Sequence, residues 1–214
     1  MRLKALLAVL LVTSTISPNL VLAQAVTFAD APLGSPPRGF EAMQTGPGAP
    51  GQWQVVTDEE AAGGRAVAQV NQDRTDSRFP LLIYRPTVPA DVEVSTRMRP
   101  VLGKVDQAGG LAVRLQDANN YYIVRANALE GNVRFYKVID GKRQQLAGKE
   151  VRVASNRWHG LRLRAQGDRF TVWFDDQELF SVADQTFRSP GKVAFWTKAD
   201  SVTRFGSLNI KALP

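Results

Sequence analysis

The feature of this sequence that most constrains its fold is an alternation of apolar and polar residues with a period of two. It is clearest in the segment 91–100, where one side of the chain carries Val92, Val94, Thr96 and Met98. Successive side chains of an extended chain point to opposite faces, so this pattern predicts a strand with one buried face. Comparable segments follow about every ten residues, separated by turn signals such as Asp140-Gly141. The spacing predicts an all-β sandwich or barrel.

The first residues have the pattern of a signal peptide. Arg2 and Lys4 precede an apolar run over residues 5–12, and small residues stand at Ala23 and Ala25. The run is too short to cross about 30 Å of hydrocarbon as a helix. We therefore predict cleavage after Ala23 or after Ala25, no transmembrane segment in the mature chain, and export to the periplasm or the medium.

The remaining length fits one domain. We expect a signal peptide over 1–23, an irregular lead-in with the first edge strand over 24–52, and a β-sandwich over 53–214, because residues 36–51 are rich in Gly and Pro. The chain has no cysteine, so packing must hold the fold without disulfides, and thiol chemistry is excluded.

The charge is positive and uneven. The formal net charge of +7 falls to +5 when the two charges of the signal segment are subtracted (7 − 2). Between residues 125 and 169 there are eleven Lys or Arg against four Asp or Glu, and they alternate with apolar residues. We interpret this excess as a solvated strand face that keeps a sheet edge from aggregating, and nucleic-acid binding is not expected because no recognised motif accompanies it.

Few residues form a catalytic pattern. His159 is the only histidine and no Gly-x-Ser-x-Gly motif accompanies it, so we interpret it as a strand-end residue without a catalytic role. Glycoside hydrolysis needs two carboxylates across a cleft. Asp91 and Glu93 share the outward face of one predicted strand, which makes Glu93 the catalytic candidate if the protein is an enzyme. The pairs Asp175-Asp176 and Glu59-Glu60 fit solvated turn acids.

We predict no cofactor and no metal site. A histidine-based metal site needs more than one such ligand, and only one histidine is present. The oxygen-rich segment Asp117, Asn119 and Asn120 offers ligands that suit calcium. The same composition is what a turn requires, and we favour the turn.

Several aromatic and arginine side chains have the parity of the solvent face. The aromatic residues are Tyr121, Trp173 and Trp196. An exposed ring presents a flat apolar surface on which the C–H face of a sugar stacks. Arginine adds fork-shaped donors for hydroxyl or carboxylate groups, here at Arg97, Arg99, Arg114 and Arg125. We predict that this set binds a poly- or oligosaccharide, neutral or anionic. The alternative for each ring is that it covers a sheet edge or packs under a loop.

Three stretches together resemble the concanavalin A-like lectin/glucanase superfamily, including its laminin-G-like and 3-keto-disaccharide-hydrolase-like bacterial domains. The first is Gly39 to Val55, and the second is Asp91 to Arg99 followed by Gly109 to Arg114 and Asn120 to Tyr122. The third is Trp158-His159-Gly160-Leu161-Arg162-Leu163, then Gly167 to Asp175, and it continues through Asp184, Phe187, Gly191 to Thr197 and Phe205. The resemblance implies a jelly-roll sandwich of two antiparallel sheets, one of them concave and often holding glycan or catalytic residues. Two features depart from the pattern: Asp175-Asp176-Gln177 stands where Asp-Gly is common, and the acidic triplet of the glucanases, Glu-x-Asp-x-x-Glu, is missing.

The leading functional hypothesis is therefore an exported, non-catalytic module for glycan binding or cell-envelope interaction. One alternative is a carbohydrate-active hydrolase or lyase of the 3-keto-disaccharide-hydrolase-like type, with its carboxylate at Glu93. A second alternative is a structural envelope protein without a small ligand. Fold resemblance by itself does not decide between them, since one fold hosts many functions.

Overall fold

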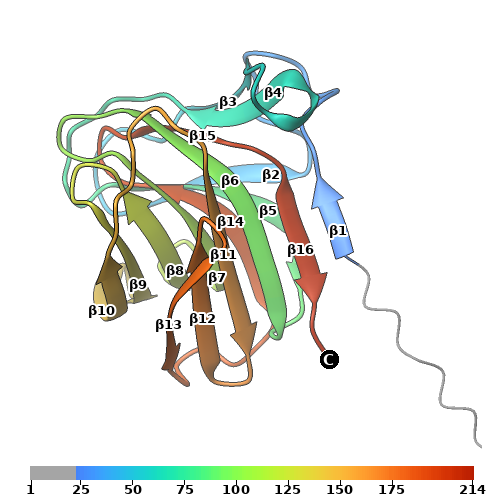
Figure 1. Ribbon diagram of the computed structural model, residues 1–214, viewed down its shortest axis with the longest axis vertical. Coiled ribbons are helices and arrows are strands. Elements are labelled where there is room, and N and C mark those ends of the chain that lie inside the picture. Colours follow the sequence, from blue (N-terminus) through green and yellow to red (C-terminus); the bar gives the residue numbers. More distant parts are fainter. Residues whose placement is uncertain (1–22) are drawn as a thin grey trace, which may run out of the picture.

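A computed structural model describes residues 23–214, which form a sandwich of two antiparallel β-sheets (Figure 1). Sheet A contains, in spatial order, β13 (Gln177–Ala183), β12 (Arg169–Phe174), β11 (His159–Gln166), β6 (Val92–Leu102), β15 (Val202–Phe205), β4 (Arg65–Gln69) and β3 (Trp53–Thr57). In the same sheet β16 (Leu208–Ala212) also pairs with β6, and β1 (Ala23–Val26) pairs with β16.

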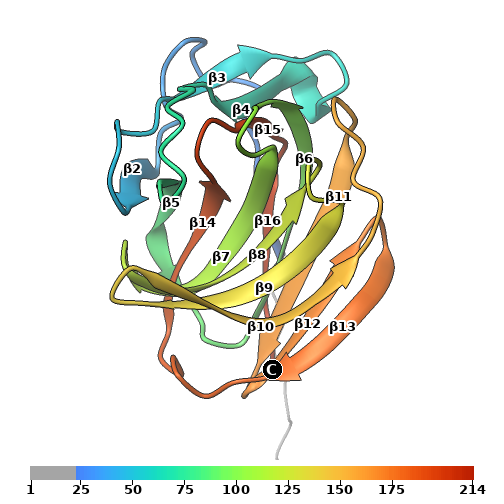
Figure 2. The same ribbon diagram turned by 90° about the vertical axis from the view of Figure 1, so that its left-hand side faces the viewer.

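Sheet B is seen from outside in Figure 2. Its spatial order is β10 (Lys142–Glu150), β9 (Asn132–Ile139), β8 (Asn120–Asn127), β7 (Ala108–Asp117), β14 (Gly191–Thr197), β5 (Phe79–Val88) and β2 (Phe40–Thr45). A short 3₁₀ turn, η1 (Ala62–Gly64), interrupts the strands. The expected all-β, two-sheet jelly-roll sandwich is confirmed.

The N-terminal predictions fall partly outside the described residues. Residues 1–22 are not described, so the signal peptide over 1–23 stays a prediction. Within 24–52, where we expected an irregular lead-in with one edge strand, β2 lies at the edge of sheet B and most of β1 at the edge of sheet A. In the part of the chain from residue 23 onward, no helix has the length and apolar character needed to cross a membrane.

The core lies between the inner faces of the two sheets. Val92, Val94 and Met98 of β6 have no exposed surface, as the alternation predicted, and they pack with residues from sheet B. Aromatic rings hold the centre together: Phe170 of sheet A lies 4.3 Å from Tyr122 and 5.0 Å from Phe135, measured between ring centroids. Burying each such ring contributes about 1.5–3 kcal/mol, so the stability of the sandwich comes mainly from this layer.

The outer face of sheet B carries a second apolar cluster. Tyr121 and Trp196 lie on this face, as their parity predicted, but neither has any exposed surface. The indole N–H of Trp196 donates to the hydroxyl of Tyr121 at 3.3 Å, and Phe79 stacks on the indole with centroids 5.4 Å apart. The expectation that Tyr121 and Trp196 present open rings to a ligand is therefore wrong.

Curvature of sheet B explains this burial. Thr45 of β2 lies 2.8 Å from the hydroxyl of Tyr121 on β8, oxygen to oxygen. Three strands separate β2 from β8 in the sheet order, and in a flat sheet that separation would be about 19 Å. The sheet must bend toward its outer face for the two side chains to meet. The resulting hollow is filled by its own aromatic rings, and the guanidinium of Arg143 lies 4.4 Å from the centroid of Phe79 and 5.8 Å from that of Trp196.

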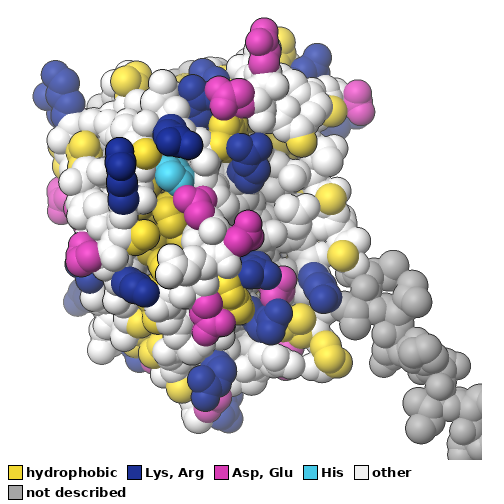
Figure 3. Space-filling model, in the orientation of Figure 1, with side chains coloured by type: hydrophobic (Ala, Val, Ile, Leu, Met, Phe, Trp, Pro, Cys, Tyr) yellow, Lys and Arg dark blue, Asp and Glu magenta, His cyan; other side chains and the backbone are white. Residues whose placement is uncertain are grey.

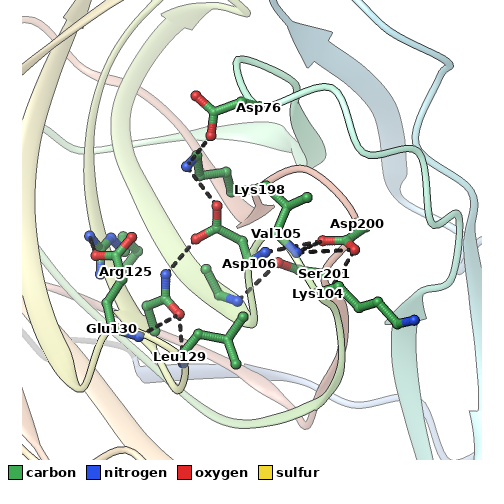
Figure 4. A network of polar contacts seen from close by, with 12 residues as sticks. Asp76, Lys104, Val105, Asp106, Arg125, Leu129, Glu130, Lys198, Asp200 and Ser201 are labelled. Carbon is green, nitrogen blue, oxygen red and sulfur yellow. Dashed lines mark hydrogen bonds and ion pairs between the residues drawn. The ribbon is translucent and has the colours of Figure 1, made fainter.

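A polar network closes one end of the same face (Figure 4). The ammonium of Lys198 lies 2.7 Å from the carboxylate of Asp76 and 2.6 Å from that of Asp106. Beside it, Arg125 pairs with Glu130 at 2.6 Å and is only 3% exposed. Arg125 is thus not the solvent-facing donor that we expected, because the loops at this end of the sandwich enclose it.

Candidate functional site

A wide hollow lies on the outer face of sheet A. It is a groove of about 590 Å³ whose floor is formed by β16, β6, β11 and β12 and whose end is formed by the turn between β12 and β13. Its lining includes Glu93, Ser95, Arg97, Trp158, Gly160, Arg162, Trp173, Asp175, Asp176 and Asn209. Figure 3 shows acidic and basic side chains interspersed on the side of the molecule that carries the single histidine.

Strand register explains why these residues meet. Ser95 of β6 pairs with both Arg162 of β11 and Asn209 of β16, and Arg162 pairs with Trp173 of β12. Directly opposed residues of antiparallel strands project from the same face, so these four side chains form one row across the sheet. The row arises from four segments that are far apart in the sequence.

Gly160 creates the depression within this surface. It lies on β11 between Trp158 and Arg162, which project to the same side about 6.5 Å away in each direction along the chain. A Cβ placed on Gly160 would meet only atoms of Asp175, at 3.9–4.0 Å, which is ordinary contact. The absence of a side chain at this position therefore leaves open space rather than relieving a clash.

Both tryptophans of the groove are flanked by guanidinium groups. The guanidinium of Arg97 lies 5.3 Å from the ring centroid of Trp158, and that of Arg162 lies 4.3 Å from the ring centroid of Trp173. Cation–π contact of this kind contributes about 0.5–1 kcal/mol at exposed sites and holds both partners in place. The rings are thus fixed beside the hollow before any ligand arrives.

Glu93 lies at the other end of the groove. Its carboxylate accepts from Arg164 at 2.7 Å and lies 3.9 Å from Arg162. Only 16% of its side chain is exposed. Glu93 therefore orients the two arginines that contact Trp173. Its expected partner Asp91 does not line the groove but binds Arg114 and the amide of Gly167, so the two acids do not form a pair across a cleft.

Two hydrogen-bond donors in the lining lack partners among the described residues. They are the indole Nε1 of Trp158 and the Nε of Arg162. A buried polar group without a partner costs about 1–3 kcal/mol, so most buried groups in native proteins are paired. Both atoms are themselves buried, so they do not reach the open space of the groove.

The acceptor side of the groove is built by Asp175. One carboxylate oxygen accepts the amide N–H of Gly160 at 2.8 Å, and the other lies 2.8 Å from Nδ1 of His159. The second ring nitrogen of His159 lies 3.1 Å from the backbone of Ala154. Both nitrogens of His159 thus face protein atoms, and its role in this structure is to orient Asp175.

The sequence-predicted residues do not all meet at one site. Glu93, Arg97 and Trp173 come together in the groove. Arg99 lies further along β6, where it binds Glu60 and Asn156 instead. The binding role of these residues stays a prediction.

The sequence interpretation missed most of the groove. The alternation alone does not single out Trp158, Gly160 or Arg162 as site residues, and Asp175 and Asp176, predicted to be solvated turn acids, also line the groove. The alternation of apolar and polar residues along β11 does place Arg162 on the outward face of a strand, and this pattern could have identified it.

Arg114 is the clearest correction. We expected it to point outward from β7, but it has a positive φ of 48° at an irregularity in the pairing of β7 with β8, and only 1% of its surface is exposed. Its guanidinium donates to the carbonyl groups of Ala90, Phe187 and Gly167. The bulge turns the side chain inward, where it joins three loops instead of facing a ligand.

The oxygen-rich segment at 117–120 forms a turn. The carboxylate of Asp117 accepts the backbone N–H of Asn119 at 2.7 Å and the side-chain amide of Asn120 at 3.0 Å. These contacts satisfy the carboxylate locally, as in other Asx turns. Among residues 23–214 no group of three or more metal-ligating side chains is found.

Comparison with known proteins identifies the fold. No protein-family profile matches the chain. The carbohydrate-binding module CBM66 from Bacillus subtilis superposes with a TM-score of 0.64 at 21% identity, covering 81% of this chain and 96% of that one. The fold is that of the concanavalin A-like lectins and glucanases. A native glycosidic hydrolase superposes with a TM-score of 0.56 at 9% identity, covering 90% of this chain and 96% of that chain. Proteins with similar sandwiches are therefore named both as binding modules and as hydrolases.

One curated relative shows sequence similarity. A levanase from Bacillus subtilis (strain 168) is 31% identical over 81 residues, which are 37% of this chain and 12% of the levanase. The match therefore covers a small part of that enzyme.

Proposed function

We propose that this chain is an exported, non-catalytic glycan-binding module whose ligand binds in the groove of sheet A. The observation that carries the proposal is the combination, in one open hollow, of two fixed tryptophan rings with guanidinium groups and an oriented carboxylate. A sugar offers the matching surface, because its C–H faces stack on rings while its hydroxyl groups both donate and accept. Pockets of this volume and mixed character are typical ligand sites.

The first ligand to test is levan. The chain shares part of its sequence with a levanase and its fold with a carbohydrate-binding module, and a binding module needs neither a nucleophile nor an acid–base pair. The ion pairs of Glu93 with Arg164 and Arg162 support a positioning role for this carboxylate rather than a reacting one. A purely structural envelope role gives no reason for an open hollow beside two fixed tryptophan rings.

Affinity electrophoresis of residues 24–214 through gels containing levan, inulin, cellulose derivatives or polygalacturonate tests the proposal. We expect retardation by at least one polysaccharide, without release of reducing sugar in the same samples. Filling the hollow with Gly160→Val should weaken that binding more than tenfold, since the added methyl groups occupy the space of the ligand.

A matched control enlarges a side chain elsewhere. Ala42→Val on the exposed edge strand β2 should leave retardation unchanged. If Gly160→Val is retarded as strongly as the unaltered protein, the groove is not the binding site. If sugar products appear and Glu93→Gln abolishes them, the chain is a hydrolase or lyase instead.

A further inference from the structure

The turn between β12 and β13 has an unfavourable sequence for its geometry. Phe174 pairs with Gln177, so the turn contains two residues, Asp175 and Asp176, with φ of 46° and 62°. Two-residue hairpin turns with both φ positive strongly favour glycine at the second position, because a Cβ is crowded in the left-handed region. Asp176 stands where glycine would be more stable.

A second hairpin of this chain shows the ordinary solution. In the turn between β9 and β10, Ile139 pairs with Lys142. The two residues between them, Asp140 and Gly141, have φ of 49° and 75°. The two turns have the same backbone form and differ in whether the second residue carries a carboxylate. Strained residues that persist where a cheaper choice exists tend to lie at functional sites.

Both carboxylates of the strained turn line the groove. That of Asp175 is fixed by the Gly160 amide and by His159, as described above. Asp176 is exposed, and among residues 23–214 no hydrogen bond or ion pair of its side chain is found. The β12–β13 turn therefore offers carboxylate oxygens to a ligand. Those of Asp175 are fixed in direction, and those of Asp176 are free to adjust.

The charges of the groove favour an uncharged ligand beside the β12–β13 turn. Glu93 already neutralises part of the guanidinium charge of Arg162 and Arg164, while Arg97 lies against Trp158. The carboxylates of Asp175 and Asp176 face the same hollow. They attract hydroxyl donors and repel carboxylate or sulfate groups, because like charges at short range raise the free energy of binding.

We propose that Asp175 and Asp176 are the specificity-determining acceptors of the groove and that they select an uncharged, hydroxyl-rich sugar over an acidic one. The proposal rests on glycan binding in the groove. It assigns the backbone strain of the β12–β13 turn to ligand recognition and gives His159 the part of a positioning residue for Asp175.

The decisive variant is Asp176→Gly, because it should change stability and binding in opposite directions. Relief of the left-handed strain should raise Tm by about 2 °C, while loss of the acceptor should raise Kd for levan at least fivefold. Asp176→Asn, which tolerates positive φ but is uncharged, should weaken levan binding less. In Asp175→Asn with Asp176→Asn, binding of polygalacturonate should increase relative to levan.

The matched control introduces the same strain away from the groove. Gly141→Asp should lower Tm and leave Kd for levan unchanged, because the β9–β10 turn lies in the other sheet. A Kd for Asp176→Gly within twofold of the unaltered protein overturns the proposal, as does tighter binding of polygalacturonate than of levan by the unaltered protein. If Gly160→Val abolishes binding while Asp176→Gly does not, only this inference fails. If neither variant changes binding, the proposed function fails with it.

Discussion

The outer faces of sheet A and sheet B both carry tryptophan and arginine side chains at positions that the alternation places away from the core. On sheet B, Trp196 and Arg143 are gathered into a closed cluster by the bend of the sheet. On sheet A, Trp173 and Arg162 line an open groove, with Gly160 leaving the space between the rings empty. The same residue types thus stabilise one face and offer a binding surface on the other. What separates the two is the shape of the sheet and one missing side chain, not composition.

The largest effect on stability should come from removing a ring of the closed cluster on the outer face of sheet B. Trp196→Ala removes a fully buried indole and leaves a cavity, so the free energy of unfolding should fall by about 3–5 kcal/mol in urea denaturation. Levan binding by the folded fraction should not change. A variant that keeps full stability but loses binding would reverse our assignment of the two faces.

A somewhat smaller effect should follow from the polar network beside that cluster. Lys198→Met leaves the carboxylate of Asp106, which is 1% exposed, without its cation, and should cost about 3 kcal/mol at pH 7. Burial raises the pKa of Asp106, and the Lys198 contact opposes that rise. Protonation at lower pH removes the buried charge, so the cost should shrink as pH falls. A cost independent of pH, measured by urea denaturation at several pH values, would contradict this account.

On the open face, truncation should affect binding more than stability. Trp173→Ala should weaken glycan binding by about 2 kcal/mol, roughly 30-fold, as for other aromatic anchors. Because Trp173 is half-buried on the outer surface, unfolding should change by only about 1 kcal/mol. Isothermal titration calorimetry and thermal unfolding measure the two quantities. Equal losses in both would mean that this face, too, is structural.

The smallest effect concerns the seam where the two sheets meet. Burial alone would raise the pKa of Asp184, but hydrogen bonds from Lys137, Thr186 and Tyr122 outweigh it and hold that pKa well below its usual range. A depressed carboxylate pKa stabilises the fold above the unfolded-state value near 4, and this contribution is lost as pH falls through the lower, folded-state pKa. Asp184→Asn should therefore cost about 1 kcal/mol at pH 7 and progressively less in acid. Thermal unfolding between pH 2 and pH 7 checks this, and parallel curves for the two proteins would contradict it.

The sequence by itself determined the fold class and much of the inward and outward assignment. Period-two alternation is a local property, so it can be recognised without knowing the partner strands, and it correctly placed Val94 inside and Trp173 outside. The resemblance carried by the segment from Trp158 onward added the jelly roll, which the structural comparison confirmed. Three of the groove residues, Glu93, Arg97 and Trp173, followed from the same alternation.

Only the tertiary structure decided which outward residues remain exposed. A face that points away from the core is still buried if its sheet bends over it, as at Tyr121, and curvature depends on how all the strands pair. A bulge at Arg114 reversed the side of one strand, which no simple alternation predicts. The groove itself depends on the order of β16, β6, β11 and β12, four segments distant in the chain. Their register is set by long-range packing, because side-chain parity says which face a residue joins but not which neighbours it will meet there.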